Sequence, residues 1–159
     1  MDELMLFIDG SVHAQAKTGY GAYLAVAERG LPLDLLETRV KVRRFAQTSS
    51  TKLELQTLLW ALGDVQAAGS RVIVYTDCQN ILGLRGRRGR LEQNDYRARN
   101  GRRLNNYELY REFYEMTDQL HCELVKVRGH MASPQKDDID RLFTLVDRAA
   151  RNALRGDIR

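Results

Sequence analysis

Two aspartates follow short apolar runs at distant points of the chain. Asp9 follows the run at 6–8, and Asp77 follows the run RVIVYT at 71–76. Such runs are typical of buried strands, and the ligand sites of open α/β sheets lie beyond the carboxyl ends of strands. If the two strands are parallel neighbours, Asp9 and Asp77 repel each other at close range, and a divalent cation such as Mg²⁺ removes that repulsion. We therefore predict a metal site between them.

Glu54 is a third candidate ligand. Leucines recur at helical spacing around it and predict a helix over 53–62. Glu54 lies in the first turns of that helix, on the shoulder of the apolar stripe, so that its side chain is aimed partly at the sheet. The alternative is a surface glutamate that interacts favourably with a helix N-terminus. The sequence alone leaves both interpretations open.

A local cluster of arginines lies between residues 84 and 106. Eight Arg and two acids give this segment a charge of +6, and since the whole chain carries +4, the remainder carries −2. Local arginine clusters suit the phosphate backbone of a nucleic acid. The alternative is a solvated loop without a partner. We expect a nucleic-acid partner.

The hydrophobic pattern sets the expected order of elements. Strands are predicted at 4–8, 19–29 and 37–45, and short links such as GLPLD at 30–34 indicate an antiparallel meander. The remaining elements are expected as a helix at 53–62, a strand at 71–77, a helix at 107–120, a strand at 122–130 and a helix from Ser133 to Arg155, with Ser133 as N-cap and Pro134 at its first position. This order predicts one α/β domain with a five-stranded mixed sheet flanked by helices.

The composition excludes several classes of protein. No apolar run approaches the ~18 residues of a membrane span, and the N-terminus lacks the basic start of a signal peptide, so we expect a cytoplasmic protein without membrane association. Cys78 and Cys122 form no CxxC pair and are expected to be reduced thiols. The chain has no GxSxG nucleophile motif and no GxxxxGK[ST] phosphate loop. Nothing indicates an obligate protein partner, and a monomer is expected.

Five short motifs, in order, resemble the type 1 ribonuclease H family. They are LFIDGS at 6–11, GYGAYL at 19–24, TSSTKLELQTLLWAL at 48–62, VYTDCQN at 74–80 and KVRGH at 126–130, followed by a final helix. The resemblance runs from residue 4 to about residue 155. It implies a ribonuclease H-like fold over residues 1–159, with antiparallel first three strands. It also implies hydrolysis of the RNA strand of an RNA/DNA hybrid by two Mg²⁺ ions, with Mn²⁺ as a substitute, held by a D-E-D-D set of acids.

The resemblance assigns roles by position. Asp9, Glu54 and Asp77 match the first three acids as catalytic metal ligands. His130, in the KVRGH motif, matches a loop histidine that helps proton transfer or product release.

The fourth acid is either Asp140 or Asp147. Spacing from His130 favours Asp140, whereas packing favours Asp147, because the family's final helix presses on the sheet through small residues after the acid. Asp147 is followed by alanines at 149, 150 and 153, and Asp140 by Leu and Phe at 142 and 143. We expect Asp147 to be the ligand, with Asp140 as the alternative.

Substrate contacts are implied in two places. Ser50 and Thr51, in the loop before Glu54, and Gln79, after Asp77, match positions that contact the ribose 2′-OH, although the family often has Asn in that loop. The segment at about 84–106 matches a basic protrusion that grips the DNA strand. We expect phosphate contacts there that do not read sequence, from Arg87, Arg88, Arg102 and Arg103.

Two other functions fit the same pattern. One is a different nuclease of this fold, such as a junction resolvase or an exonuclease. The other is a non-catalytic nucleic-acid-binding module. Three intact acids argue against the module, because a pure binder gains nothing from a negative cluster facing phosphates.

Overall fold

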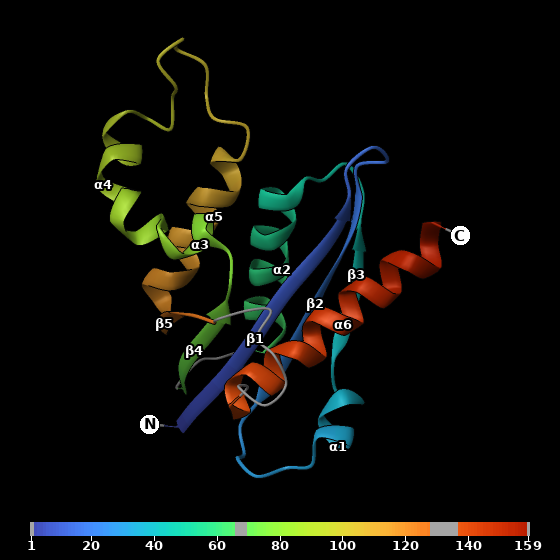
Figure 1. The fold of residues 1–159 in the computed structure, drawn as a ribbon. Coiled ribbons are helices and arrows are strands. Elements are labelled where there is room, and N and C mark those ends of the chain that lie inside the picture. Colours follow the sequence, from blue (N-terminus) through green and yellow to red (C-terminus); the bar gives the residue numbers. More distant parts are fainter. Residues whose placement is uncertain (1, 66–69, 128–136, 159) are drawn as a thin grey trace.

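The chain folds around a five-stranded mixed sheet with the strand order β3-β2-β1-β4-β5 (Figure 1). The computed structural model describes residues 2–65, 70–127 and 137–158. The first three strands are β1 (Asp2–His13), β2 (Thr18–Val26) and β3 (Lys41–Phe45), and both of their pairings are antiparallel. β4 (Ser70–Thr76) pairs parallel with β1, and β5 (His121–Lys126) pairs parallel with β4. The predicted mixed sheet is confirmed.

Helices cover both faces of this sheet. α2 (Ser50–Asp64) and α5 (Tyr107–Gln119) lie on one face, and α6 (Asp138–Ile158) crosses the other (Figure 1). The alternation along β1 explains both layers, because Leu6 and Ile8 pack in the α2 and α5 cluster whereas Met5 and Phe7 pack in the α6 cluster. No helix in the described part of the chain is long and apolar enough to cross a membrane.

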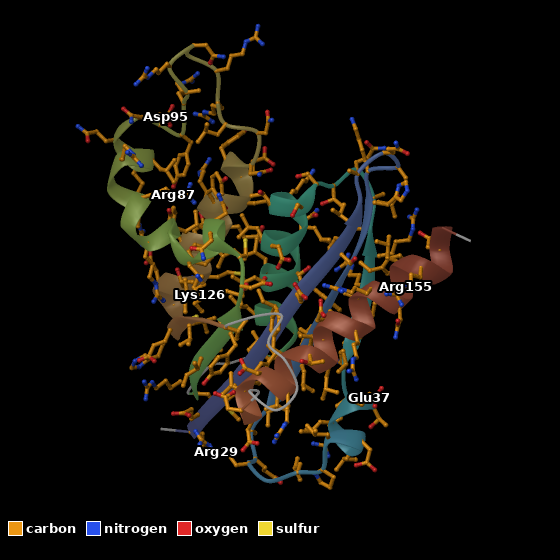
Figure 2. All side chains as sticks on the ribbon, viewed as in Figure 1. Arg29, Glu37, Arg87, Asp95, Lys126 and Arg155 are labelled. Atoms are coloured by element: carbon orange, nitrogen blue, oxygen red, sulfur yellow. The ribbon has the colours of Figure 1, made fainter. Side chains whose placement is uncertain are left out.

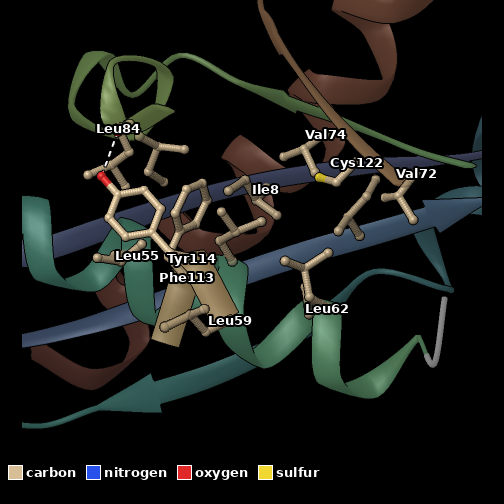
Figure 3. Packing of buried hydrophobic residues seen from close by; sticks show 14 of the residues in the cluster. Ile8, Leu55, Leu59, Leu62, Val72, Val74, Leu84, Phe113, Tyr114 and Cys122 are labelled. Carbon is tan, nitrogen blue, oxygen red and sulfur yellow. Dashed lines mark hydrogen bonds between the residues drawn. The ribbon is translucent and has the colours of Figure 1, made fainter. Parts of the chain in front are cut away.

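The core beneath α2 and α5 also fixes the start of the basic segment. Figure 3 shows leucines of α2 packed against Phe113 and Tyr114 of α5 and against valines of β4. The hydroxyl of buried Tyr114 donates a hydrogen bond of 2.5 Å to the carbonyl of Leu84. Leu84 begins α4 (Leu84–Gln93), which follows the short α3 (Gln79–Leu82). The segment predicted only as basic is therefore partly helical and anchored to the core at its base.

Several elements differ from the prediction. β1 continues four residues beyond Asp9, because 9–13 pair with β2 in a long hairpin. A short helix, α1 (Leu33–Glu37), occupies the expected link and the start of the expected third strand, because Leu36 turns into the core from a helical turn. α6 begins at Asp138, and the predicted N-cap Ser133 lies outside the described residues.

A close approach between α2 and the β1–β2 hairpin sets the position of the helix. A Cβ atom at Gly21 would lie 2.0 Å from the Oγ1 atom of Thr57 on α2. Gly19 is similarly close, since a Cβ there would lie 2.7 Å from the Cδ2 atom of Leu53. Thr57 cannot swing away freely, because its buried hydroxyl donates to the carbonyl of Leu53 at 2.7 Å. The absent side chains let α2 lie directly on the hairpin.

We expect Gly21→Ala to destabilise the protein by about 1–3 kcal/mol, because the added methyl group overpacks the contact with Thr57. Gly63→Ala is the matched control. It adds the same methyl group to α2 at a site with open space, and we expect it to be stabilising by about 0.5–1 kcal/mol, since Ala is the better helix former. Urea denaturation measures both. Equal effects of the two substitutions would contradict the packing argument.

Candidate active site

Strand register brings Asp9 and Asp77 together. The last parallel pair between β1 and β4 is Phe7 with Tyr75, so Asp9 and Asp77 follow it by two residues on each strand. Asp77 follows the end of β4 as predicted, but Asp9 lies inside β1 because the hairpin with β2 continues. Since β4 stops at Thr76, no strand of the described residues pairs with β1 on that side at Asp9.

Glu54 reaches the same place from α2. The Ser49 hydroxyl caps this helix by accepting a bond of 3.4 Å from the backbone N–H of Lys52. Glu54 is only 8% exposed, so it is not a surface residue. A Cβ atom at Gly10 would lie 3.4 Å from its Oε1 atom and 2.9 Å from the Leu53 side chain. Glycine at position 10 therefore leaves the space into which Glu54 extends toward Asp9.

Carboxylate oxygens of Asp9, Glu54 and Asp77 all lie within 4.8 Å of one another. Asp9 and Glu54 are buried, while Asp77 is accessible to solvent. The buried Oε2 atom of Glu54 has no hydrogen-bond partner among the described residues. A buried acceptor without a donor is costly, and hard oxygen donors clustered in this way suit Mg²⁺. The residues present thus fit a divalent cation.

The acidic cluster raises the pKa values of two of its own carboxyls, those of Asp9 and Glu54. Burial, the charge of Glu54, a hydrogen bond with Asp147 and the charge of Asp77 raise the pKa of Asp9 far above its ordinary value. Burial and the charge of Asp77 raise the pKa of Glu54. The nearby backbone N–H of Gly10 lowers the pKa of both carboxyls, which opposes these shifts without cancelling them. A metal-free site therefore keeps protons that a cation would displace.

Asp147 lies on the α6 side of the cluster. Its carboxyl is near enough to Asp9 to raise the pKa of that residue, because Asp9 shares the sheet face of Phe7, which α6 covers. Val146 and Ala150 beside it are fully buried and hold this turn of α6 on the sheet. Arg151, one turn further on, forms an ion pair in which its Nε atom lies 3.0 Å from the Oδ1 atom of Asp147.

Asp140 is engaged in the start of α6. Its backbone N–H donates to the Oδ1 atom of Asp137 at 2.8 Å, and its own Oδ2 atom accepts from the Asp137 N–H at 3.3 Å. This reciprocal pair is a capping box, in which two residues satisfy each other's unpaired N–H groups at a helix start. Asp140 therefore stabilises the N-terminus of α6, while Asp147 lies two turns further along the helix, at the acidic cluster.

The remaining expected site residues fall in three groups. His130 lies outside the described residues. Ser50 begins α2 and is exposed, with Thr51 half-buried behind it. Gln79 begins α3 and is exposed two residues after Asp77. These polar side chains flank the acidic cluster on the sides of α2 and α3.

The arginines of the basic segment divide by their partners. α4 and residues 94–106 project away from the sheet, as the positions of Arg87 and Asp95 in Figure 2 show. Arg88 binds both carboxylate oxygens of Asp118 at 2.5 and 2.8 Å and also Glu92 at 2.6 Å. Arg87 donates to the Asn80 carbonyl at 2.8 Å, and Arg103 to Asp95 at 3.0 Å. Arg85 donates to the Cys122 carbonyl, and Arg97 donates to the Gly101 carbonyl and pairs with Asp95.

Three arginines of this segment have exposed side chains with no hydrogen bond or ion pair to the described residues. They are Arg90, Arg99 and Arg102. Of the four arginines expected to contact substrate, Arg102 is the one in this group. The other three, Arg87, Arg88 and Arg103, hold the segment in shape.

The sequence analysis did not identify Gly10 and Arg151, which adjoin the acidic cluster, or Asp137, which caps α6. The D-x-x-x-R spacing of Asp147 and Arg151 is a helical pair that the sequence displays. The D-x-x-D spacing of Asp137 and Asp140 resembles the capping-box pattern. Gly10 carries no such signal, because its role appears only when α2 lies against β1.

Comparison with known proteins agrees with this architecture. The family model described as RNase H matches residues 1–154. The chain belongs to the RNase H family. Members of this family are nucleases that act on RNA and normally use a divalent metal. The cluster of Asp9, Glu54 and Asp77 is the part of this chain that could bind one.

Two solved structures share the fold at low sequence identity. The prototype foamy virus protease-reverse transcriptase is 12% identical with a TM-score of 0.75, and the match covers 95% of this chain and 20% of the viral chain. LC9-RNase H1, a type 1 RNase H with the type 2 active-site motif, is 18% identical with a TM-score of 0.71, covering 98% of this chain and 73% of that protein. This chain thus spans about a fifth of the viral protein.

The raised pKa values predict that the free energy of unfolding of the metal-free protein depends on pH. A carboxyl whose folded pKa is raised costs nothing below its unfolded pKa and lowers stability as the pH rises toward its folded pKa. In EDTA, Asp9→Asn should therefore match wild type near pH 4 and be more stable by about 1–3 kcal/mol at pH 7. Urea denaturation at several pH values measures the difference, and one that does not change with pH contradicts the electrostatic account.

Proposed function

We propose that the chain is a type 1 ribonuclease H, a Mg²⁺-dependent endonuclease that hydrolyses the RNA strand of RNA/DNA hybrids. The observation that carries this proposal is the convergence of three carboxylates, together with a buried Oε2 atom of Glu54 that has no hydrogen-bond partner among the described residues. Family membership supports a nuclease that acts on RNA. Hybrid specificity and the metal mechanism rest on the resemblance and on the arguments below.

The acidic cluster would hold the metal. Asp9, Glu54 and Asp77 supply oxygens within reach of a shared ion, and Asp147 supplies a fourth carboxylate through its contact with Asp9. Two bound Mg²⁺ ions would activate a water molecule and stabilise the departing 3′ oxygen. Four carboxylates balance the charge of two such ions. The capping role of Asp140 supports the assignment of Asp147 as the fourth ligand.

The protein itself contributes position and charge. The absence of a side chain at Gly10 leaves room for Glu54 beside β1, and the α2 N-cap fixes the turn that carries Glu54. The accessible carboxylate of Asp77 would meet the phosphate of the substrate. His130 would assist proton transfer or product release, a role that follows from the KVRGH motif.

A hollow of about 430 Å³ beside the α2 N-terminus suits a backbone phosphate. Its walls include Lys17 from the β1–β2 turn and Lys52 from α2, with Thr48 and Ser50 between them and Asn106 from the base of α5. Cationic, hydroxyl and amide groups are the usual phosphate partners. We propose that the DNA strand is held here, while Ser50, Thr51 and Gln79 contact ribose 2′-hydroxyls of the RNA strand.

The basic segment would hold the DNA strand further along. We propose that Arg102, together with Arg90 and Arg99, makes the phosphate contacts, because these guanidinium groups have no partner within the described residues. Arg87, Arg88 and Arg103 would act on binding mainly by maintaining the shape of the segment. A monomeric, cytoplasmic enzyme without an obligate partner completes the proposal, and sedimentation of the purified chain tests the monomer.

We expect the protein to cut a hybrid labelled on its RNA strand at internal positions in Mg²⁺ and to leave it intact in EDTA. Asp77→Asn should lower the cleavage rate by at least about 100-fold, because it removes the accessible carboxylate of the cluster. Gel separation of the products measures both results. Cleavage of DNA junctions with intact hybrids would instead favour a resolvase, and shortening from the ends an exonuclease.

The same assay distinguishes the two candidate fourth acids. Asp147→Asn should lose activity to a similar degree as Asp77→Asn and remain folded. Asp140→Asn should keep most of its activity and of its stability, because the amide oxygen of Asn can still accept the cap hydrogen bond. The reverse pattern would assign the fourth ligand to Asp140.

The division of arginines predicts two different phenotypes. Arg102→Ala should leave the melting temperature unchanged, weaken hybrid binding and reduce the dependence of affinity on salt by about one counterion. Arg88→Ala should lower the melting temperature, because it breaks the link between α4 and Asp118 of α5. Binding titrations at several salt concentrations in EDTA, with thermal melts, measure the contrast. Equal melting temperatures and equal salt slopes for the two variants would contradict the division.

A further inference from the structure

The edge strand β3 carries cations that lie on aromatic rings. Lys41 and Arg43 are two residues apart on β3, so their side chains lie on the same face of the sheet. The Lys41 Nζ atom lies 5.8 Å from the centre of the Tyr23 ring. The Arg43 Cζ atom lies 5.0 Å from the centre of the Phe45 ring and 5.9 Å from that of Trp60. This set of two cations and three rings is here named the edge platform.

The rings of the edge platform support one another. Trp60 packs edge-to-face against Tyr23, with ring centres 4.8 Å apart, and against Phe45 at 6.3 Å. The Tyr23 hydroxyl donates to Asp64 at 2.7 Å, which fixes its ring. Tyr23 is buried, whereas Phe45 and Trp60 remain partly exposed. The platform is therefore fixed from below and open from outside.

Neither cation of the edge platform has a carboxylate partner in the described part of the chain. Both side chains belong to exposed residues, and no ion pair involves either. The neighbouring Arg44 differs, because it points to the other face of the sheet and binds Asp157 at 3.2 Å. An exposed cation over a ring and without a counter-ion is available to an anionic ligand.

A hollow of about 230 Å³ adjoins the platform. Arg43, Phe45, Gln56 and Trp60 line one side, and Leu109 and Glu112 of α5 line the other. This hollow lies beside the proposed phosphate site, because the hydroxyl of Thr48, which lines that site, donates to the Oε1 atom of Gln56, which lines the hollow, at 2.7 Å. The loop after Phe45 runs directly from the platform to Thr48. A strand leaving the phosphate site thus meets the platform next.

We propose that the edge platform binds single-stranded nucleic acid that extends beyond the hybrid. Bases stack on exposed aromatic rings and on guanidinium planes, and backbone phosphates bind the cations, which is how sequence-independent single-strand sites are built. The hollow has room for one ring-sized group, with Glu112 on the far wall directing phosphates to the Arg43 side. The inference rests on the proposed function only in taking the strand to arrive from the Thr48 site.

Charged residues on an edge strand also prevent pairing with other sheets. That role needs charge alone, and Arg44 on the same strand supplies it as well as Arg43 does. It does not require stacking on Trp60 or continuity with the Thr48 site. The comparison of Arg43 with Arg44 therefore separates the two roles.

Trp60 is the sole tryptophan of the chain, so its fluorescence reports on the platform directly. In EDTA, which prevents cleavage, we expect a hybrid with a single-stranded DNA or RNA overhang of about six nucleotides to quench Trp60. The blunt hybrid should leave the fluorescence unchanged. Overhangs on each end of each strand identify which strand reaches the platform. Identical fluorescence with blunt and overhanging hybrids would overturn the proposal.

Arg43→Gln should reduce the affinity gain that an overhang gives by about fivefold or more, as loss of a stacked cationic contact does. Arg44→Gln is the matched control, with the same charge change on the opposite face of the same strand. It should leave the gain unchanged. Circular dichroism melts establish that both variants are folded. Equal losses of this affinity gain in the two variants would contradict binding at the platform and would leave charge on the edge strand as the explanation.

Cleavage of the blunt hybrid separates this inference from the proposed function. Arg43→Gln should cut the blunt hybrid in Mg²⁺ at the wild-type rate, because the platform lies outside the catalytic cluster. If wild type cuts the blunt hybrid and shows no overhang effect, the platform proposal fails alone. If wild type cuts no hybrid, yet single-stranded DNA quenches Trp60, the proposed function fails and single-strand binding stands.

Discussion

The rest of the structure must accommodate three carboxylates whose oxygens lie within 4.8 Å of one another. Like charges at such distances, two of them on buried residues, oppose folding unless protons or cations compensate them. In the metal-free chain, this repulsion and the burial of the carboxylates raise the pKa values of Asp9 and Glu54. The surrounding fold must hold the acids in place against that repulsion, and several of its features are explained by this requirement.

The clearest of these features is the close contact of α2 with the β1–β2 hairpin. Gly10, Gly19 and Gly21 remove the side chains that would separate the helix from the strands. On the opposite face, Val146 and Ala150 seat α6 on the sheet at the turn that carries Asp147. Backbone proximity on both faces brings helical carboxylates to a strand carboxylate. Tight packing elsewhere thus offsets a locally unfavourable charge arrangement, as expected for sites that trade stability for function.

The parts that the sequence predicted were those governed by local pattern and register. The apolar runs before Asp9 and Asp77 indicated two strands, whose parallel pairing the structure confirms. Helical spacing allowed Glu54 either to face the sheet or to lie on the surface, and its burial decides for the sheet. α1 was missed, because the turn around Leu36 depends on the core that receives it. The extension of β1 to His13 depends on pairing with β2, which the local sequence does not display. His130 lies outside the described residues and stays a prediction.

Charge in the basic segment shows the limit of counting residues. The segment carries +6 in the sequence, yet five of its eight arginines bind carboxylates or backbone carbonyls. The carboxylates beside Arg88, Arg97 and Arg103 offset the charges of these three guanidinium groups, and Arg85 and Arg87 have donors already engaged by backbone carbonyls. The attraction for a phosphate backbone therefore comes from the unpaired cations. Within the described residues, these include Arg90, Arg99 and Arg102 on the basic segment, Lys17 at the Thr48 site, and Lys41 and Arg43 on the edge platform. They lie on separate elements, so the folded chain, and not the arginine cluster alone, determines the path that a nucleic acid can follow.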